Sequence, residues 1–244
     1  LKPNDLEVAS DFIDIECLDR FTEQAIKWLD GQTSASRNGK PFMLYLSYTS
    51  PHKPVIPLKR FRGKGGAGAY GDFMMETDWH VGRVLDCIDK NKLTDNTVVV
   101  FTSDNGPEST WRRRIEEYNH HSNGIYREGK RSIYEGGHRV PFLIRWPNNV
   151  KASSKWDSPV CQTDFLATFA DILGKKLPEN AGEDSVSFYK ALIGQDAPQR
   201  FAMIHHSMRG RYAVREGKWK LIMESGSKDS KRELYDLSVD PGEL

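Results

Sequence analysis

The stretch from Thr97 to Gly106 constrains the fold of this chain more than any other part of the sequence. It begins as a continuous apolar run rich in β-branched residues, which is typical of a strand buried on both faces of a mainly parallel sheet. The run ends in small polar side chains followed by the turn formers Gly106 and Pro107. In open α/β sheets, ligands bind beyond the carboxyl ends of the strands. The stretch therefore predicts an α/β fold with a polar turn at the edge where ligands bind.

Two residues of that turn, Asp104 and Asn105, have side chains that could bind a metal ion. A carboxylate and an amide oxygen are the kind of ligand that calcium and magnesium take. The same Asp-Asn-Gly sequence is also typical of an ordinary turn, in which the side chains bond only to nearby backbone. The turn alone therefore leaves both interpretations open.

Strand-like and helix-like segments alternate along the first part of the chain, which favours an α/β domain over residues 1–195. The strand-like segments are apolar, and the helix-like segments have apolar residues at helical spacing. Single residues set the predicted helix ends: Gly31 ends the first helix, Asp72 caps the second and Gly174 ends the third. The predicted strands cover 41–48, 97–104 and 140–147, and the predicted helices cover 18–29, 72–91 and 163–173.

Short strand-like segments follow after residue 195. The sequence Glu216-Gly217-Lys218 predicts a tight hairpin turn between two of them. We therefore predict a small antiparallel subdomain over residues 196–244. In contrast, residues 107–138 show no stable period and predict irregular structure.

The composition is that of an ordinary globular protein, with 38% hydrophobic residues. The 35 basic and 34 acidic residues give a net charge of +1, so charge favours neither a nucleic acid nor a membrane surface as partner. The arginine run 112–114 could recruit an anionic polymer, although a solvated face is the commoner role of such a run. The cysteines Cys17, Cys87 and Cys161 are far apart and predict neither a disulfide framework nor a zinc site.

Polar residues also gather near the other predicted strands. His52 follows the strand over 41–48, and residues 127–139 precede the strand over 140–147. Residues 127–139 combine glycines, which let a ligand approach the backbone, with several cations, which suit an anion. A bound cation, a titratable histidine and a lysine in one crevice would suit attack on an anionic ester.

Four motifs together resemble the type I sulfatases, which belong to the alkaline-phosphatase-like superfamily. They occur in the order and with the approximate spacing of that family, over nearly the whole chain. The resemblance implies an α/β fold with a mixed, mainly parallel sheet flanked by helices, and a small C-terminal antiparallel sheet. The motifs are Ser50-Pro51-His52-x-Pro54, Thr102-Ser103-Asp104-Asn105-Gly106, Gly129-Lys130 followed by Tyr134-Glu135-Gly136-Gly137-x-Arg139-Val140-Pro141, and Glu233-Leu234-Tyr235-Asp236-Leu237-x-x-Asp240-Pro241.

The resemblance implies a role for four residues. Asp104 and Asn105 match two of the calcium ligands of the family. His52 matches the general acid that protonates the departing oxygen, and Lys130 matches the lysine that contacts the sulfate. The implied activity is hydrolysis of aryl or carbohydrate sulfates. Its partner would be a sulfated small molecule or glycan, with no nucleic acid and no membrane.

The nucleophile of the family is absent from this sequence. Type I sulfatases use a formylglycine made from Cys or Ser in the context Cys/Ser-x-Pro-x-Arg, and no cysteine here has that context. The paired aspartates of the family's first strand and a Lys-x-His segment are also absent and would belong upstream of Leu1. We therefore expect a truncated chain with an incomplete calcium site, which does not turn over substrate by itself.

Several residues and functions remain open at this point. Arg127 and Arg131 could contact the anion in place of Lys130. His121 could line the substrate pocket or simply lie in a loop, and His80, inside a helical pattern, is expected to be structural. Two other functions fit the motifs: a phosphodiesterase or phosphonate-ester hydrolase of the same superfamily, and a non-catalytic pseudoenzyme that binds sulfated glycans. The family is mostly exported, so the resemblance implies the periplasm, the lysosome or the outside of the cell.

Overall fold

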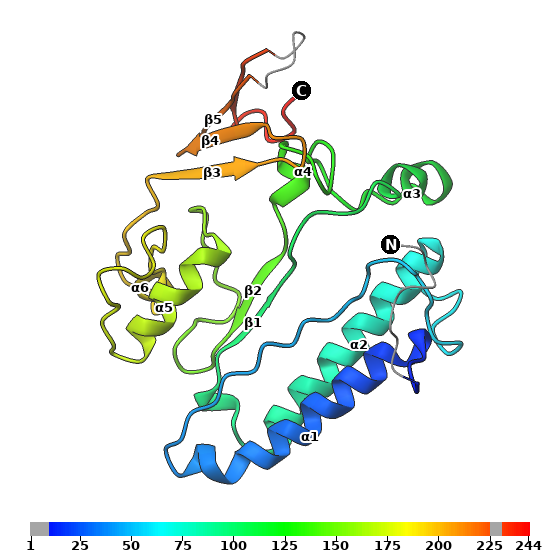
Figure 1. The fold of residues 1–244 in the computed structure, drawn as a ribbon, viewed down its shortest axis with the longest axis vertical. Helices are drawn as coiled ribbons and strands as arrows, with labels where there is room; N and C mark the ends of the chain where they lie inside the picture. The colour runs from blue at the N-terminus through cyan, green and yellow to red at the C-terminus, as the bar shows by residue number, and fades with distance from the viewer. Residues whose placement is uncertain (1–9, 225–230) are drawn as a thin grey trace. The chain divides into compact units, whose positions relative to one another are not determined.

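The computed structural model describes residues 10–224 and 231–244, which form two compact units (Figure 1). Of the described residues, 10–97 and 114–120 belong to unit 1, and 98–113, 121–224 and 231–244 belong to unit 2. Within the described residues, no helix is long and apolar enough to cross a bilayer.

Unit 1 contains two long helices that lie side by side, α1 (Cys17–Arg37) and α2 (Gly68–Lys90) (Figure 1). Apolar residues at helical spacing give each helix one face for burial. Ala25 and Leu29 of α1 and Ile88 of α2 are among the buried residues. Short 3-10 turns accompany the helices: η2 (Asp14–Glu16) precedes α1, and η3 (Thr94–Asn96) follows α2.

Both predicted helices of unit 1 exist, but two of their predicted ends are wrong. The helix α1 continues through Gly31 to Arg37, and it ends before Gly39, whose φ of +82° favours glycine. An internal glycine costs a helix only about 1 kcal/mol, which the buried face of α1 offsets. Asp72 lies inside α2 rather than at its N-cap, and its carboxylate accepts the backbone N–H groups of residues 63–65 at 2.8, 2.9 and 2.7 Å.

The predicted strand over residues 41–48 is extended but pairs with no strand in the described part of the chain. The ring of Phe42 meets that of Trp28 on α1 edge-on, with the centroids 5.7 Å apart. Met43 and Tyr45, on the alternate face, are exposed. A strand needs hydrogen-bonded neighbours to become part of a sheet. The prediction of a buried strand is therefore wrong for the described residues.

In unit 2, the predicted central strand forms β1 (Val99–Thr102) and pairs antiparallel with β2 (Phe142–Arg145). The expected parallel pairing and burial on both faces are absent from the described residues, because these two strands make a ribbon without further strands. Phe101 and its partner Leu143 are consequently exposed on one face. The rings of the other face are covered, since Phe142 stacks on Phe165 with the centroids 5.8 Å apart.

Short helices complete this part of unit 2: η4 (Gln162–Asp164), α5 (Phe165–Ile172) and α6 (Tyr189–Leu192). The third predicted helix is thus confirmed, and Gly174 follows it with a φ of +61°. Residues 107–138, predicted to be irregular, contain α3 (Trp111–Tyr118) and α4 (Glu135–His138). Both helices are too short for a period to stand out from the polar sequence around them.

A four-stranded antiparallel sheet forms the C-terminal part of unit 2, as predicted (Figure 1). The predicted hairpin is confirmed, because residues 217 and 218 connect two neighbouring strands and Gly217 has a φ of +53°. Ala213 and Ile222 are fully buried against Ile133, which precedes α4. The domain boundary between residues 195 and 196 remains a prediction. The strands, in their order across the sheet, are β3 (Ala202–His206), β4 (Tyr212–Glu216), β5 (Trp219–Ile222) and β6 (Glu233–Asp236).

Candidate active site

The turn that follows β1 docks directly on the loop that contains Lys130. The N–H of Gly106 donates to the carbonyl oxygen of Gly137 at 2.9 Å, and the N–H of Lys130 donates to that of Pro107 at 2.8 Å. A Cβ on Gly106 would lie 1.8 Å from the carbonyl oxygen of Gly136, so only glycine permits this approach. The structure therefore brings the backbone of Lys130 beside the turn that carries Asp104.

The two predicted metal ligands offer oxygen atoms at this turn. Asp104 is exposed, and Asn105 is half-buried. The Nδ2 group of Asn105 donates to the carbonyl oxygen of Gly106 at 3.0 Å, which commits the amide nitrogen and leaves Oδ1 as a ligand atom. Gln162 holds the start of the turn, since its Nε2 donates to the carbonyl oxygen of Ser103 at 2.6 Å. A carboxylate and an amide oxygen fit calcium, as two of the six to eight ligands that it takes.

The structure distinguishes Lys130 from the neighbouring arginines. Arg131 forms an ion pair with Glu108 at 2.5 Å, which lowers the pKa of the Glu108 carboxyl group to about 2. Arg127 donates to the carbonyl oxygen of Glu243 at 2.8 Å and lies over the ring of Tyr134. Lys130 is half-buried, and its ammonium group has no hydrogen bond or ion pair to residues 10–224 or 231–244. Lys130 is therefore the cation of this loop that remains available for an anionic ligand.

His52 is described within unit 1, whereas Asp104, Asn105 and Lys130 belong to unit 2. The His52 side chain is exposed, and its Nδ1 lies 2.8 Å from the carbonyl oxygen of Lys53. Because a carbonyl oxygen only accepts, Nδ1 must carry the proton in this hydrogen bond. Nε2 is then the nitrogen that can exchange a proton with a ligand.

Other residues singled out in the sequence have structural surroundings. His80 is fully buried, with Nδ1 2.8 Å from the hydroxyl of Thr22, and burial lowers its pKa to about 4. Arg114 is buried over the ring of Tyr70, 3.7 Å from its centroid. His121 is exposed in a loop. His80 and Arg114 are therefore packed inside unit 1 and are not available to a polymer or substrate.

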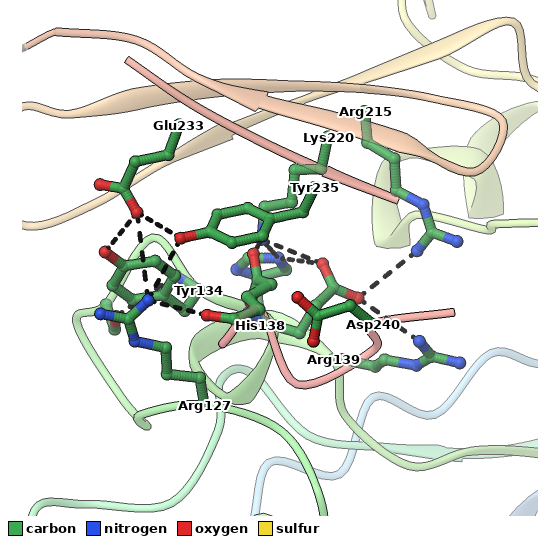
Figure 2. A network of polar contacts seen from close by, with 12 residues as sticks. Arg127, Tyr134, His138, Arg139, Arg215, Lys220, Glu233, Tyr235 and Asp240 are labelled. Atoms are coloured by element: carbon green, nitrogen blue, oxygen red, sulfur yellow. Dashed lines mark hydrogen bonds and ion pairs between the residues drawn. The ribbon is translucent and has the colours of Figure 1, made fainter. Parts of the chain in front are cut away.

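A buried ion cluster between α4 and β5 was not predicted (Figure 2). The ammonium group of Lys220, on β5, lies 3.0 Å from Oε1 of Glu135 and 2.8 Å from Oε1 of Glu243, and all three side chains are at most 1% exposed. The Nε2 of His138 lies 3.4 Å from the same ammonium group. The sequence held one signal for this cluster. Side chains alternate between the two faces of a strand, so Lys220 must face the same way as the core residue Ile222.

Glu135, His138 and His205 also place one ligand atom each within 4.8 Å of one another, a spacing that a metal ion could use. The ammonium group of Lys220 already contacts two of the three, Glu135 at 3.0 Å and His138 at 3.4 Å, and Arg139 and Arg215 each lie 3.5 Å from the Glu135 carboxylate. Burial, reinforced by His138 and Lys220, lowers the pKa of His205 to about 3. The positive charges of Lys220, Arg139 and Arg215 would repel a divalent ion, so the cluster does not fit a metal.

Two family models match the chain. The model described as sulfatase matches residues 15–175. The model described as the C-terminal part of N-sulphoglucosamine sulphohydrolase matches residues 124–244. Together they match residues of both units; the loop of Lys130 lies in the range that both models match, and the turn of Asp104 and Asn105 lies in the range of the first model.

Individual relatives show the same likeness. The chain is 38% identical over 225 residues to an N-acetylgalactosamine-6-O-sulfatase of Bacteroides thetaiotaomicron, over 85% of this chain and 44% of that protein. It is 32% identical over 238 residues to human arylsulfatase A, over 88% of this chain and 46% of that protein. A solved protein described under the metabolism of multiple glycosaminoglycans by Bacteroides thetaiotaomicron superposes with a TM-score of 0.85 at 34% identity, over 95% of this chain and 50% of that one. The chain thus spans about half the length of the proteins it matches.

Proposed function

The chain belongs to the sulfatase family, and from this premise we propose that the protein hydrolyses sulfate esters of carbohydrates or aryl compounds. The names of its relatives support both substrate classes, because one is an N-acetylgalactosamine-6-O-sulfatase and another is arylsulfatase A. A sulfated glycan or a sulfated small molecule is accordingly the proposed partner.

The observation that carries this proposal is the docking of the Lys130 backbone on the turn of Asp104 and Asn105. It joins two oxygen ligands for a hard cation to a lysine whose ammonium group is free within the described residues. A sulfate ester develops negative charge on its oxygens during hydrolysis, and cations beside those oxygens stabilise the transition state. Calcium, held in part by Asp104 and Asn105, would supply such positive charge. Lys130 would contact the sulfate oxygens from the loop.

We assign His52 the role of general acid. Its exposure lets it reach a ligand, and the hydrogen bond of Nδ1 to Lys53 leaves Nε2 as the atom that exchanges the proton. The departing alcohol or phenol leaves as an oxyanion unless it receives a proton, so a positioned acid accelerates the step. We assign no residue of this chain as the nucleophile, because no cysteine or serine here lies in the Cys/Ser-x-Pro-x-Arg context. A formylglycine outside this sequence is the proposed nucleophile.

The proposal is tested on the complete protein with an aryl sulfate and the matching aryl phosphate. We expect sulfate release, and we expect Lys130→Ala to lower kcat/KM for the sulfate about 100-fold. Lys151→Ala, at an exposed lysine of the same unit, is the matched control and should leave the rate unchanged. Stoichiometric binding without turnover would show a pseudoenzyme, and preference for the phosphate would show a phosphoester hydrolase. Either result would contradict the proposal.

A further inference from the structure

We propose that Lys220 is a positioning residue for the candidate active site. Its buried ammonium group fixes the segment from Glu135 to Gly137, against which the turn of Asp104 and Asn105 docks. This inference rests on the proposed function, because the segment that Lys220 fixes supports the same candidate site. Lys220 itself touches none of the proposed ligand-binding residues, so it acts only through the backbone between them.

Two buried carboxylates hold the side chain of Lys220, and the ring of His138 lies beside it. Its ammonium group contacts Glu135 at 3.0 Å, Glu243 at 2.8 Å and the Nε2 of His138 at 3.4 Å (Figure 2). Glu135 of α4 accepts a hydrogen bond from the ammonium group, and Glu243, after β6, forms an ion pair with it, whereas the Nε2 of His138 lies 3.2 Å from Oε1 of Glu135 and donates to that carboxylate. Lys220 and Glu243 are completely buried, and Glu135 is 1% exposed. A lysine so buried would be costly without such partners.

A short series of contacts leads from Lys220 to the candidate site. Glu243 accepts the N–H of Glu135 at 2.5 Å, so both ends of Glu135 are fixed by the cluster. The next residue, Gly136, donates its N–H to the carbonyl oxygen of Arg127 at 2.9 Å, and the carbonyl oxygen of Gly137 accepts the N–H of Gly106. Gly106 is one residue from Asn105. The two glycines thus connect the ion cluster to the turn that carries the proposed calcium ligands.

Loss of the ammonium group would leave two carboxylates buried together. The burial of Glu135 would raise the pKa of its carboxyl group, but the contacts with His138 and Lys220 outweigh burial and hold the pKa well below its ordinary value. The guanidinium groups of Arg139 and Arg215 lie 3.5 Å from Oε2 of Glu135, whereas Lys220 contacts Oε1. The arginines therefore do not replace the ammonium group between Glu135 and Glu243. Without Lys220, repulsion between Glu135 and Glu243 would push α4 and the glycine contact apart.

Amide hydrogen exchange of the complete protein, without added metal or substrate, tests this inference. The two reporters are the amides of Gly106 and Lys130, which close the contact between turn and loop. In Lys220→Met, we expect both amides to exchange at least tenfold faster. This acceleration should exceed any acceleration at the amide of Leu173, which caps the end of α5 and donates to the carbonyl oxygen of Phe169. Lys218→Met removes an exposed ion pair with Asp236 from the same hairpin, and it should leave both reporters unchanged.

Equal acceleration at Gly106, Lys130 and Leu173, or none at the two reporters, would overturn the inference. If Lys220→Met does not fold, Glu243→Gln provides the test, because it removes one charge of the cluster while keeping the shape of the side chain. It should accelerate the same two amides selectively. The exchange result is independent of turnover: absence of sulfatase activity would refute the proposed function alone, and unselective exchange would refute the positioning role alone.

Discussion

Gly106 lies against the carbonyl oxygen of Gly136 so closely that a Cβ on Gly106 would come within 1.8 Å of it. Backbone rather than a flexible side chain causes this restriction, so no rotamer change can relieve it. The same approach allows the N–H of Gly106 to reach the carbonyl oxygen of Gly137 at 2.9 Å. The position of Asp104 and Asn105 relative to α4 therefore depends on the absence of a side chain at residue 106.

The first prediction is that Gly106→Ala destabilises unit 2. A methyl group at this position must displace the backbone of Gly136, and overpacking of this kind typically costs about 1–3 kcal/mol. Chemical denaturation followed by circular dichroism measures the change in the free energy of unfolding. Gly82→Ala is the matched control, because a Cβ on Gly82 in α2 meets no atom within 4 Å. It should be neutral or stabilise the chain by up to about 1 kcal/mol, and an equal loss in both variants would contradict the prediction.

The sequence predicted those features that depend on neighbours along the chain. The hairpin at Gly217 and the end of α5 at Gly174 each need a local backbone conformation that glycine supplies. The α/β fold class followed from the order of motifs and is confirmed by the overlap with a solved relative at a TM-score of 0.85. Asp104 and Lys130 are candidate site residues from their motifs, and the structure joins their segments through the backbone.

Features that depend on distant partners could not be predicted. The alternation along β5 places Lys220 on the side of the core, but its partner Glu135 is 85 residues away in the sequence, and nothing local identifies it. β1 pairs with β2 and not with residues 41–48. An apolar segment in the sequence does not show which other segment it pairs with. Asp72 followed a glycine-rich loop and resembled a cap, yet its carboxylate reaches back to that loop from inside α2.

The second prediction is that Asp72→Asn destabilises unit 1. The Asp72 carboxylate accepts three backbone N–H groups. Burial raises the pKa of this carboxyl group, but the three hydrogen bonds outweigh burial and hold the pKa below its ordinary value. An amide cannot replace both carboxylate oxygens as an acceptor, so we expect a loss of about 2 kcal/mol in the free energy of unfolding. Asp78→Asn, at an exposed position of the same helix, is the control and should change little. Equal stability of the two variants would show that Asp72 does not organise the loop.

The third prediction concerns acid and unit 1. His80 stays neutral in the folded chain down to about pH 4, whereas the ordinary pKa of 6.5 applies when the chain is unfolded. The unfolded state therefore binds more protons between these values, and the free energy of unfolding should decrease as the pH falls from 6.5 to 4, by up to about 3 kcal/mol.

Thermal unfolding at a series of pH values measures this effect. His80→Gln should flatten the dependence in that window, while His52→Gln, at an exposed histidine of the same unit, should keep it. An unchanged pH dependence in His80→Gln would mean that other groups cause the loss in acid.

The last prediction tests the role of His52 in the complete protein. A general acid matters most when the leaving oxygen is strongly basic, because a weakly basic phenolate can depart without a proton. We therefore expect His52→Ala to lower kcat/KM by about 100-fold or more for an alkyl sulfate, but by far less for a nitrophenyl sulfate. A series of aryl sulfates with graded phenol pKa values should give a steeper dependence of log kcat/KM on leaving-group pKa in the variant than in the parent protein. Parallel dependences in the two proteins would mean that His52 contributes to binding and not to proton transfer.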